Sequence, residues 1–196
     1  MNLKLKTALI LFASCVVVFS ITSFLNAEQN PFNSEYKVLD ALNKMQDKTV
    51  TVVEIEQEIH VNASVEQTFS ALLDINSWWI HRYSDTPNSL RFEAEAGGRF
   101  WETRDGSKEN SVLWGVVSSI EPNDHIAFSG NIGMQGAVLG NVVICTNPQD
   151  DGTTIVTVSH QILGIFPEGY VQGFDKGWEQ SLKNLKEHIE SDETIP

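Results

Sequence analysis

Cysteine is scarce in this chain of 196 residues, in which only Cys15 and Cys145 occur. Cys15 lies in an apolar stretch near the N-terminus, so Cys145 is alone in the remainder. A single cysteine can form neither an internal disulfide nor a cysteine-based metal site. The fold must therefore be held together by its hydrophobic core, and the chain is long enough to build one.

Basic residues are also few. The chain has 13 Lys and Arg against 26 Asp and Glu, a formal net charge of -13, and no run of Lys and Arg follows Lys6. Nucleic acid and anionic lipid surfaces repel such a chain unless it carries a local basic patch. We therefore expect no nucleic-acid partner and interpret the acidic residues as a well-solvated surface.

The common catalytic and cofactor-binding motifs are missing as well. The sequence has no G-x-S-x-G, no H-E-x-x-H, no Walker loop and no Rossmann fingerprint. The five histidines show no metal-ligand spacing, and the glycines between residues 130 and 140 are typical of turns and bulges. We therefore assign no cofactor, no metal site and no catalytic residue from motifs.

Residues 1–27 have the pattern of an export signal. Lys4 and Lys6 precede an almost wholly apolar or small stretch over residues 7–25, and Ala27 is a small residue at the expected cleavage point. We expect cleavage there and export to the periplasm or to the outside of the cell.

Two alternatives to a cleaved signal remain. The apolar stretch 7–25 is close to the roughly 20 residues that span a bilayer, so it could stay as an uncleaved anchor. The sequence from Phe12 to Cys15 is a loose lipobox, but the apolar run continues past Cys15, which a lipoprotein signal should not do. Membrane contact is expected only through an uncleaved N-terminal segment.

The rest of the chain predicts one domain. Residues 28–49 form a polar extension, with a short helix expected over Ser34–Met45, where apolar residues have helical spacing. A period of two begins at Val50 and opens a domain over residues 50–191, which leaves a tail of residues 192–196. In the first strand one buried face is expected to hold Val53, Ile55, Gln57, Ile59 and Val61.

Turn and cap signals divide this domain into helices and strands. Ser64 and Gln67 fit a capping box, and a second short helix is expected around Trp78 and Trp79, of which only one should face inward. Further strands are expected at Leu90–Ala94, Arg99–Arg104, Ser111–Glu121 (with Trp114, Val116 and Ile120 on one side), His125–Gly130, 136–146 and 153–163.

A long helix is expected from about Pro167 to Ser191. Pro167 and Glu168 suit its start, and its apolar stripe consists of Phe174, Trp178, Leu182, Leu185 and Ile189. A curved antiparallel sheet wrapped around this helix would bury every apolar face, and it would leave a hollow between sheet and helix. The fold class predicted by these patterns is therefore α+β.

Four segments, in this order along the chain, resemble the START-like (SRPBCC) superfamily, and within it the branch grouped with activators of heat-shock-chaperone ATPases. They are ASVEQTFSALLDINSWW, GGRFWE, LWGVVSSIEPNDHIAFSG and GWEQSLKNLKEHIE. The resemblance covers roughly residues 50–191 and implies the helix-grip fold with a cavity. It implies no shared catalytic triad or cofactor motif, so no functional residue can be transferred by position.

His160 is the first candidate for a polar ligand contact. Strand alternation places it on an inward face together with Val156, Val158 and Ile162. A buried histidine needs partners for its ring nitrogens, so it is either a satisfied core residue or a polar anchor. Gln57 is a second candidate, because its lone amide among aliphatic side chains also needs partners.

Four aromatic residues complete the candidate ligand-binding set, since all fall on expected inward faces: Trp114, Phe128, Phe174 and Trp178. Core packing alone explains most of them, although one residue can line core and cavity together. Glu102 could join a histidine and an amide in acid–base chemistry, but its place near a strand end favours solvent exposure.

We therefore expect an exported protein that binds a small hydrophobic or amphipathic molecule. One alternative is an enzyme of cyclase or dehydratase type that uses His160 with a nearby acid. Another is a chaperone-like module that binds proteins through its surface, although export would separate it from a cytosolic chaperone and its ATP. The identity of the ligand and the oligomeric state are left open by the sequence.

Overall fold

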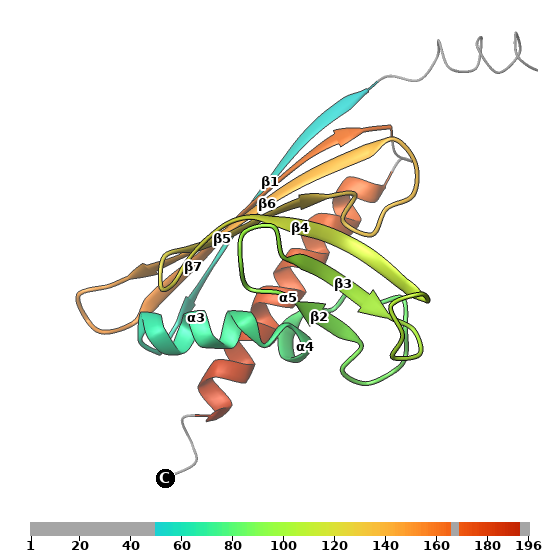
Figure 1. The fold of residues 1–196 in the computed structure, drawn as a ribbon. Coiled ribbons are helices and arrows are strands. Elements are labelled where there is room, and N and C mark those ends of the chain that lie inside the picture. The colour runs from blue at the N-terminus through green and yellow to red at the C-terminus, as the bar shows by residue number, and fades with distance from the viewer. Residues whose placement is uncertain (1–49, 166–168, 193–196) are drawn as a thin grey trace, which may run out of the picture. The chain divides into compact units, whose positions relative to one another are not determined.

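The computed structural model describes residues 50–165 and 169–192, which form a curved antiparallel sheet and three helices (Figure 1). The strands are β1 (Thr51–Val61), β2 (Leu90–Phe92), β3 (Arg99–Thr103), β4 (Ser111–Glu121), β5 (His125–Gly130), β6 (Val138–Pro148) and β7 (Thr154–Gly164). The helices are α3 (Val65–Leu73), α4 (Ile75–Trp78) and α5 (Tyr170–Asp192). The sheet order is β1-β7-β6-β5-β4-β3-β2.

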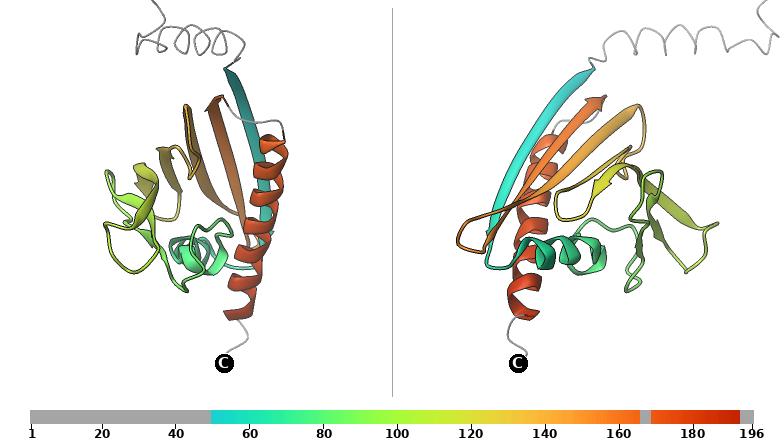
Figure 2. Two further views of the ribbon diagram at one scale, coloured as in Figure 1. Left: turned by 90° about the vertical axis from the view of Figure 1, so that its right-hand side faces the viewer. Right: turned by 60° about the vertical axis from the view of Figure 1, so that its left-hand side comes forward.

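The sheet wraps around α5, as Figure 2 shows from two sides, and this confirms the α+β helix-grip arrangement. The last strand returns beside the first, since β1 pairs with β7 along its whole length from Thr51 opposite Gly164 to Val61 opposite Thr154. The helices α3 and α4 follow β1 directly and pack against α5.

Short-range sequence patterns predicted most helices and strands close to their observed positions. The capping box is present, with the Gln67 backbone N–H donating to Ser64 Oγ and the Ser64 N–H donating to the Gln67 side chain. Burial alternates along β1 as expected. Ile55 and Val61 are buried on one face, whereas the residues of the opposite face are exposed, namely Glu54, Glu56, Glu58 and His60. The period of two therefore identified the buried face of this strand.

The prediction for β4 was wrong at Val116. The pairing of β4 is irregular at two places. Its register with β3 shifts opposite Phe100 and Trp101, and its register with β5 shifts between Val117 and Ser119, as at a β-bulge. A bulge moves the side chains that follow it to the other face. Trp114 and Val117 are therefore buried, whereas Val116 is 39% exposed.

The prediction that only one of Trp78 and Trp79 faces inward was also wrong, since both are buried. Helix α4 ends at Trp78, and Trp79 has extended dihedral angles (φ -71, ψ 121). The two side chains are therefore not constrained to the directions of successive residues in a helix, and both can be buried. The Trp78 indole N–H donates to the carbonyl oxygen of Leu72 at 3.0 Å.

Several predictions lie outside the described residues: the export signal 1–27 with its possible anchor, the extension 28–49, and Pro167 and Glu168 at the helix start. In the part of the chain that the structure describes, no helix has the length and apolar character needed to cross a membrane.

Candidate functional site

A pocket of about 510 Å³ opens at the end of the sheet where β7 finishes, β6 begins and α5 starts. We call it the mouth pocket. Its walls come from the chain after α4, from β4, from the loop between β5 and β6 and from the first turns of α5. The lining residues are His81, Arg82, Tyr83, Trp114, Ile132, Gly133, Met134, Gln135, Val138, Ile165, Tyr170 and Phe174.

No Asp or Glu is among these lining residues, although the chain carries a net charge of -13. The lining residue with a permanently charged side chain is Arg82, whose Nη2 donates to the carbonyl oxygen of Asn76 at 2.7 Å, and the aromatic residues of the lining are Trp114, Tyr83, Tyr170 and Phe174. The lining thus combines aromatic and aliphatic side chains with polar groups of similar extent, and its volume of a few hundred Å³ is in the range of small-molecule sites.

Of the six residues predicted to bind ligand, Trp114 and Phe174 line the mouth pocket. Phe128 and Trp178 are 2% and 4% exposed and lie deeper, in an aromatic cluster around Trp79. The Trp79 ring lies 5.0 to 6.4 Å from the rings of its neighbours, measured between centroids; these are Trp78, His81, Phe100, Trp114, Phe128 and Trp178. The middle of the space between sheet and helix is thus filled with side chains.

Gln57 lies on the inward side of β1, as predicted, but it is only partly buried and already has a partner. Its Nε2 donates to Oδ1 of Asp175 on α5 at 2.6 Å. This bond joins the edge strand to the long helix, and Gln57 does not line the mouth pocket.

His160 faces inward, as the alternation predicts, and it is fully buried. The Trp178 indole N–H donates to His160 Nδ1 at 3.0 Å, while Nε2 has no hydrogen-bond partner among the described residues. Burial lowers the pKa of His160 to about 4, with a smaller contribution from His81. The ring is therefore neutral near pH 7, with its hydrogen on Nε2 because Nδ1 accepts from Trp178.

His81 and Tyr83 were not selected from the sequence, because neither follows a helical or strand period. His81 packs on the backbone of Gly177, where a side chain would collide with the ring, and burial lowers its pKa. The Tyr83 hydroxyl donates to the carbonyl oxygen of Gly133 across the pocket. These contacts connect the chain after α4 to α5 and to the β5–β6 loop.

Glu102 is fully buried, contrary to the expected solvent exposure. Its carboxylate accepts hydrogen bonds from the backbone N–H groups of Tyr83 and Ser84 at 2.7 to 2.9 Å, and from the Ser89 hydroxyl at 3.3 Å. Since a buried carboxylate must be paired or hydrogen-bonded, Glu102 holds the loop that carries Tyr83. Within the described residues Glu102 makes no hydrogen bond to His160 or Gln57, so the predicted combination of acid, histidine and amide is not formed.

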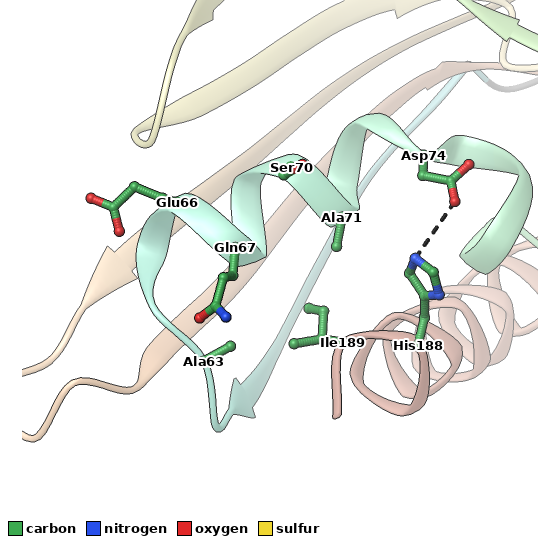
Figure 3. A pocket seen from close by; sticks show the side chains of 8 residues that line it. All are labelled: Ala63, Glu66, Gln67, Ser70, Ala71, Asp74, His188 and Ile189. Carbon is green, nitrogen blue, oxygen red and sulfur yellow. Dashed lines mark ion pairs between the residues drawn. The ribbon is translucent and has the colours of Figure 1, made fainter. Parts of the chain in front are cut away.

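Two other surface features have less to offer a ligand. Figure 3 shows a groove between α3 and α5, where His188 Nε2 lies 3.5 Å from Asp74 Oδ2 at one end and Glu66 and Gln67 lie at the other. This groove lacks aromatic residues among its lining side chains.

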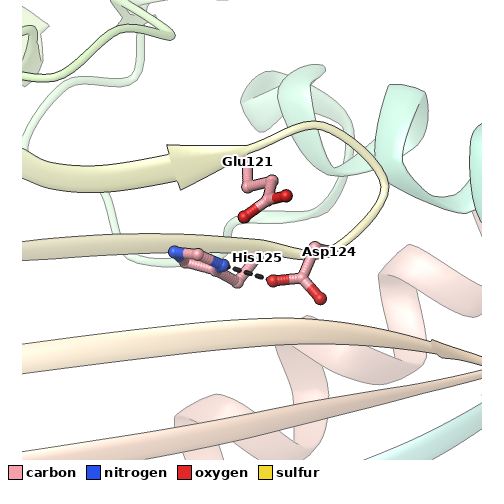
Figure 4. A group of neighbouring side chains, drawn as sticks. All are labelled: Glu121, Asp124 and His125. Carbon is pink, nitrogen blue, oxygen red and sulfur yellow. Dashed lines mark hydrogen bonds and ion pairs between the residues drawn. The ribbon is translucent and has the colours of Figure 1, made fainter.

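The second feature is the turn between β4 and β5, where Glu121, Asp124 and His125 come together (Figure 4). Both ring nitrogens of His125 already have partners, Asp124 Oδ2 at 2.5 Å and Ser119 Oγ at 2.7 Å. The cluster is thus explained by its internal hydrogen bonds.

Comparison with known proteins agrees with the fold described above. Residues 62–190 match the model of the family described as Activator of Hsp90 ATPase homolog 1-like protein. The chain belongs to this family. The resemblance to the START-like superfamily and to this branch is thereby confirmed. No curated protein matches the chain significantly.

Solved structures share the fold at low sequence identity. An uncharacterized protein from Rhizobium leguminosarum has a TM-score of 0.59 at 15% identity, covering 74% of this chain and 98% of its own. A protein of unknown function from Staphylococcus aureus has a TM-score of 0.58 at 16% identity, covering 73% of this chain and 96% of its own. A protein from Rhizobium loti has a TM-score of 0.56 at 20% identity, covering 70% of this chain and 97% of its own.

At these identities the likeness shows the fold and does not transfer a ligand or an activity. Membership of the family suggests a ligand-binding or chaperone-like function. The choice between the two depends on the residues of this chain.

Proposed function

We propose that this protein binds a small apolar or amphipathic molecule in the mouth pocket. The observation that carries the proposal is the lining itself, in which four aromatic residues and several aliphatic ones surround about 510 Å³ without a carboxylate. The ligand would lie against Trp114 and Phe174, with its far end toward the loop that carries Met134.

The packed interior supports a site at the mouth. Since the aromatic cluster around Trp79 fills the space between the sheet and the middle of α5, the room between sheet and helix in the described residues lies beyond Phe174. Protein interiors are close-packed, so opening a cavity in that cluster would be costly. The proposed site therefore uses the start of α5 and the adjacent loops.

The test is ligand binding by two matched variants of β6. Val138 lines the mouth pocket, whereas Val143 is on the opposite face of the same strand. Val138→Trp should fill the pocket and remove calorimetric binding of ethylnaphthalene, an aromatic hydrocarbon probe. Val143→Trp should leave that binding intact. Native mass spectrometry of the protein purified from its own host should show a bound small molecule.

The proposal would be wrong if the wild-type protein bound no ethylnaphthalene and carried no copurified molecule. It would also be wrong if the two tryptophan variants bound the probe equally. In either case the mouth pocket would not be a ligand site.

A chaperone-like function is the second candidate, and an apolar row on the outer face of the sheet favours it. Val52 pairs with Leu163, and Leu163 pairs with Leu139, so the three side chains adjoin across β1, β7 and β6. They are 73%, 46% and 56% exposed. Such a row could contact an apolar segment of an unfolded polypeptide.

This second candidate predicts that Leu163→Ser weakens suppression of the thermal aggregation of a model client protein, while Val138→Trp does not. The reverse result would favour the mouth pocket. The alternative of an acid–base enzyme has no comparable support, since the hydrogen-bond partner of His160 among the described residues is an indole and not a carboxylate.

A further inference from the structure

An unpaired donor lies behind the wall of the mouth pocket. His160 Nδ1 accepts from the Trp178 indole N–H, so the ring hydrogen is on Nε2. That Nε2–H is buried and has no acceptor in the part of the chain that the structure describes. A buried donor without an acceptor is unfavourable, and each such group in a folded protein needs an explanation.

The position of Nε2 links it to the pocket through Ile132. A Cβ placed on Gly140 would lie 3.0 Å from His160 Nε2 and 2.5 Å from Ile132 Cγ1. The ring nitrogen and the Ile132 side chain therefore approach the same point above Gly140. Since Ile132 lines the mouth pocket, its side chain is a barrier between the pocket and the donor, next to the Phe174 ring, which packs on His160 at 5.5 Å between centroids.

This barrier is held in an unfavourable backbone conformation. Ile132 has a φ of 48, in the left-handed region, where a β-branched residue is uncommon and strained. Gly133 and Gly136, with φ values of 74 and 105, follow in the same loop. Glycine adopts such φ values without steric cost, so the loop has two positions of high backbone freedom after Ile132.

A second unpaired donor is in the lining itself. The Trp114 ring forms part of the pocket wall, and its Nε1–H is buried without an acceptor among the described residues. Both groups are neutral donors, and the lining contains no carboxylate that could accept from them. The complementary ligand is an apolar molecule with an acceptor oxygen.

We propose that the ligand of the mouth pocket carries a neutral carbonyl oxygen, and that His160 Nε2–H is the donor that selects it once Ile132 moves aside. This inference rests on the proposed function and specifies the ligand class of the same site. A neutral carbonyl fits better than a carboxylate, because both unpaired donors are uncharged and a buried anion needs stronger compensation. The pKa of His160 is lowered by burial, which keeps the ring neutral and an Nε2–H donor at pH 7.

The test compares two probes of nearly the same shape. Acetylnaphthalene has a carbonyl group where ethylnaphthalene has a methylene group, so their affinities differ through the acceptor. The wild-type protein should bind acetylnaphthalene about 10-fold more tightly or better, as expected when a buried donor gains a partner. Naphthoate, the carboxylate counterpart, should bind more weakly than acetylnaphthalene.

The His160→Met variant should lose this preference and bind both neutral probes alike, because methionine has no N–H donor. Its matched control is His60→Met, which changes an exposed histidine on β1 and should retain the preference. Ile132→Ala should strengthen the binding of acetylnaphthalene by removing the barrier.

If His160→Met does not fold, NMR of the wild-type protein with nitrogen-labelled histidine decides the question. Addition of acetylnaphthalene should shift the His160 Nε2–H resonance, whereas ethylnaphthalene should leave it in place. Equal affinities of the two neutral probes, or tighter binding of naphthoate, would overturn the inference while leaving the proposed function intact. Failure of all three probes to bind, together with the absence of a copurified molecule, would instead overturn the proposed function.

Discussion

Acidification from pH 7.5 to pH 5 should destabilise this domain through His160. The ring is fully buried, and burial lowers its pKa from 6.5 to about 4. In the unfolded chain the ring would take up a proton near pH 6.5. Between these two values the unfolded state binds more protons than the folded state, so stability falls as the pH falls.

The size of this effect follows from the two pKa values. Above pH 6.5 the ring is neutral in both states and contributes no pH dependence. With a folded pKa of about 4, the free energy of unfolding should drop by about 2 kcal/mol between pH 7.5 and pH 5, and by about 3 kcal/mol once the pH is below 4. Carboxyl groups titrate mostly below this window, which makes pH 5 a suitable lower point.

Urea unfolding followed by tryptophan fluorescence at the two pH values would measure the loss. The His160→Gln variant is the appropriate comparison, because its amide oxygen can still accept from the Trp178 indole and the side chain does not titrate. It should lose about 2 kcal/mol less than the wild type on acidification. The pKa of His81 is also lowered by burial, but that contribution is present in both proteins and cancels.

His60→Gln, which replaces an exposed histidine, should retain the wild-type pH dependence. If His160→Gln and the wild type lost the same free energy between pH 7.5 and pH 5, the argument that His160 is held neutral by burial would be wrong.

Three further outcomes are expected. Trp178→Ala should cost about 3–5 kcal/mol in urea unfolding, because the ring is 4% exposed and bonds to His160; a loss below about 1 kcal/mol would contradict its place in the core. Glu102→Gln should cost about 1–3 kcal/mol, since an amide cannot accept from both Tyr83 and Ser84 as the carboxylate does, and an unchanged urea midpoint would refute this. N-terminal sequencing of the mature protein should begin near Glu28, and a full-length product that retains Met1 in the cytoplasm would exclude export.

The helices and strands could be predicted where the signal was local. The capping box at Ser64 needs residues only three apart, and the alternation in β1 and β7 reports a face that is buried along the whole strand. His160 was placed correctly for this reason: no bulge interrupts the pairing of β7 with either neighbour.

The prediction failed where the backbone departed from a regular period. The bulges along β4 reversed the face of Val116, and the extended dihedral angles of Trp79 allowed two adjacent tryptophans to be buried. Glu102 failed for a non-local reason, because its burial depends on N–H donors from a loop about 18 residues earlier in the chain. Neither a bulge nor a distant partner has a clear signature in a hydrophobic pattern.

The location of the candidate site illustrates the same limit. Inward-facing aromatic residues were expected to surround a hollow between sheet and helix, yet the pattern cannot tell a residue that lines a cavity from one that fills it. In the folded chain Phe128 and Trp178 fill the interior, while Trp114 and Phe174 reach the pocket. The loop residues that complete the wall, such as Ile132, follow no period and came from the structure alone. Within the described residues, the site proposed for a ligand lies at the end of the sheet where this packing stops, and the unpaired N–H groups of Trp114 and His160 lie at and just behind its wall.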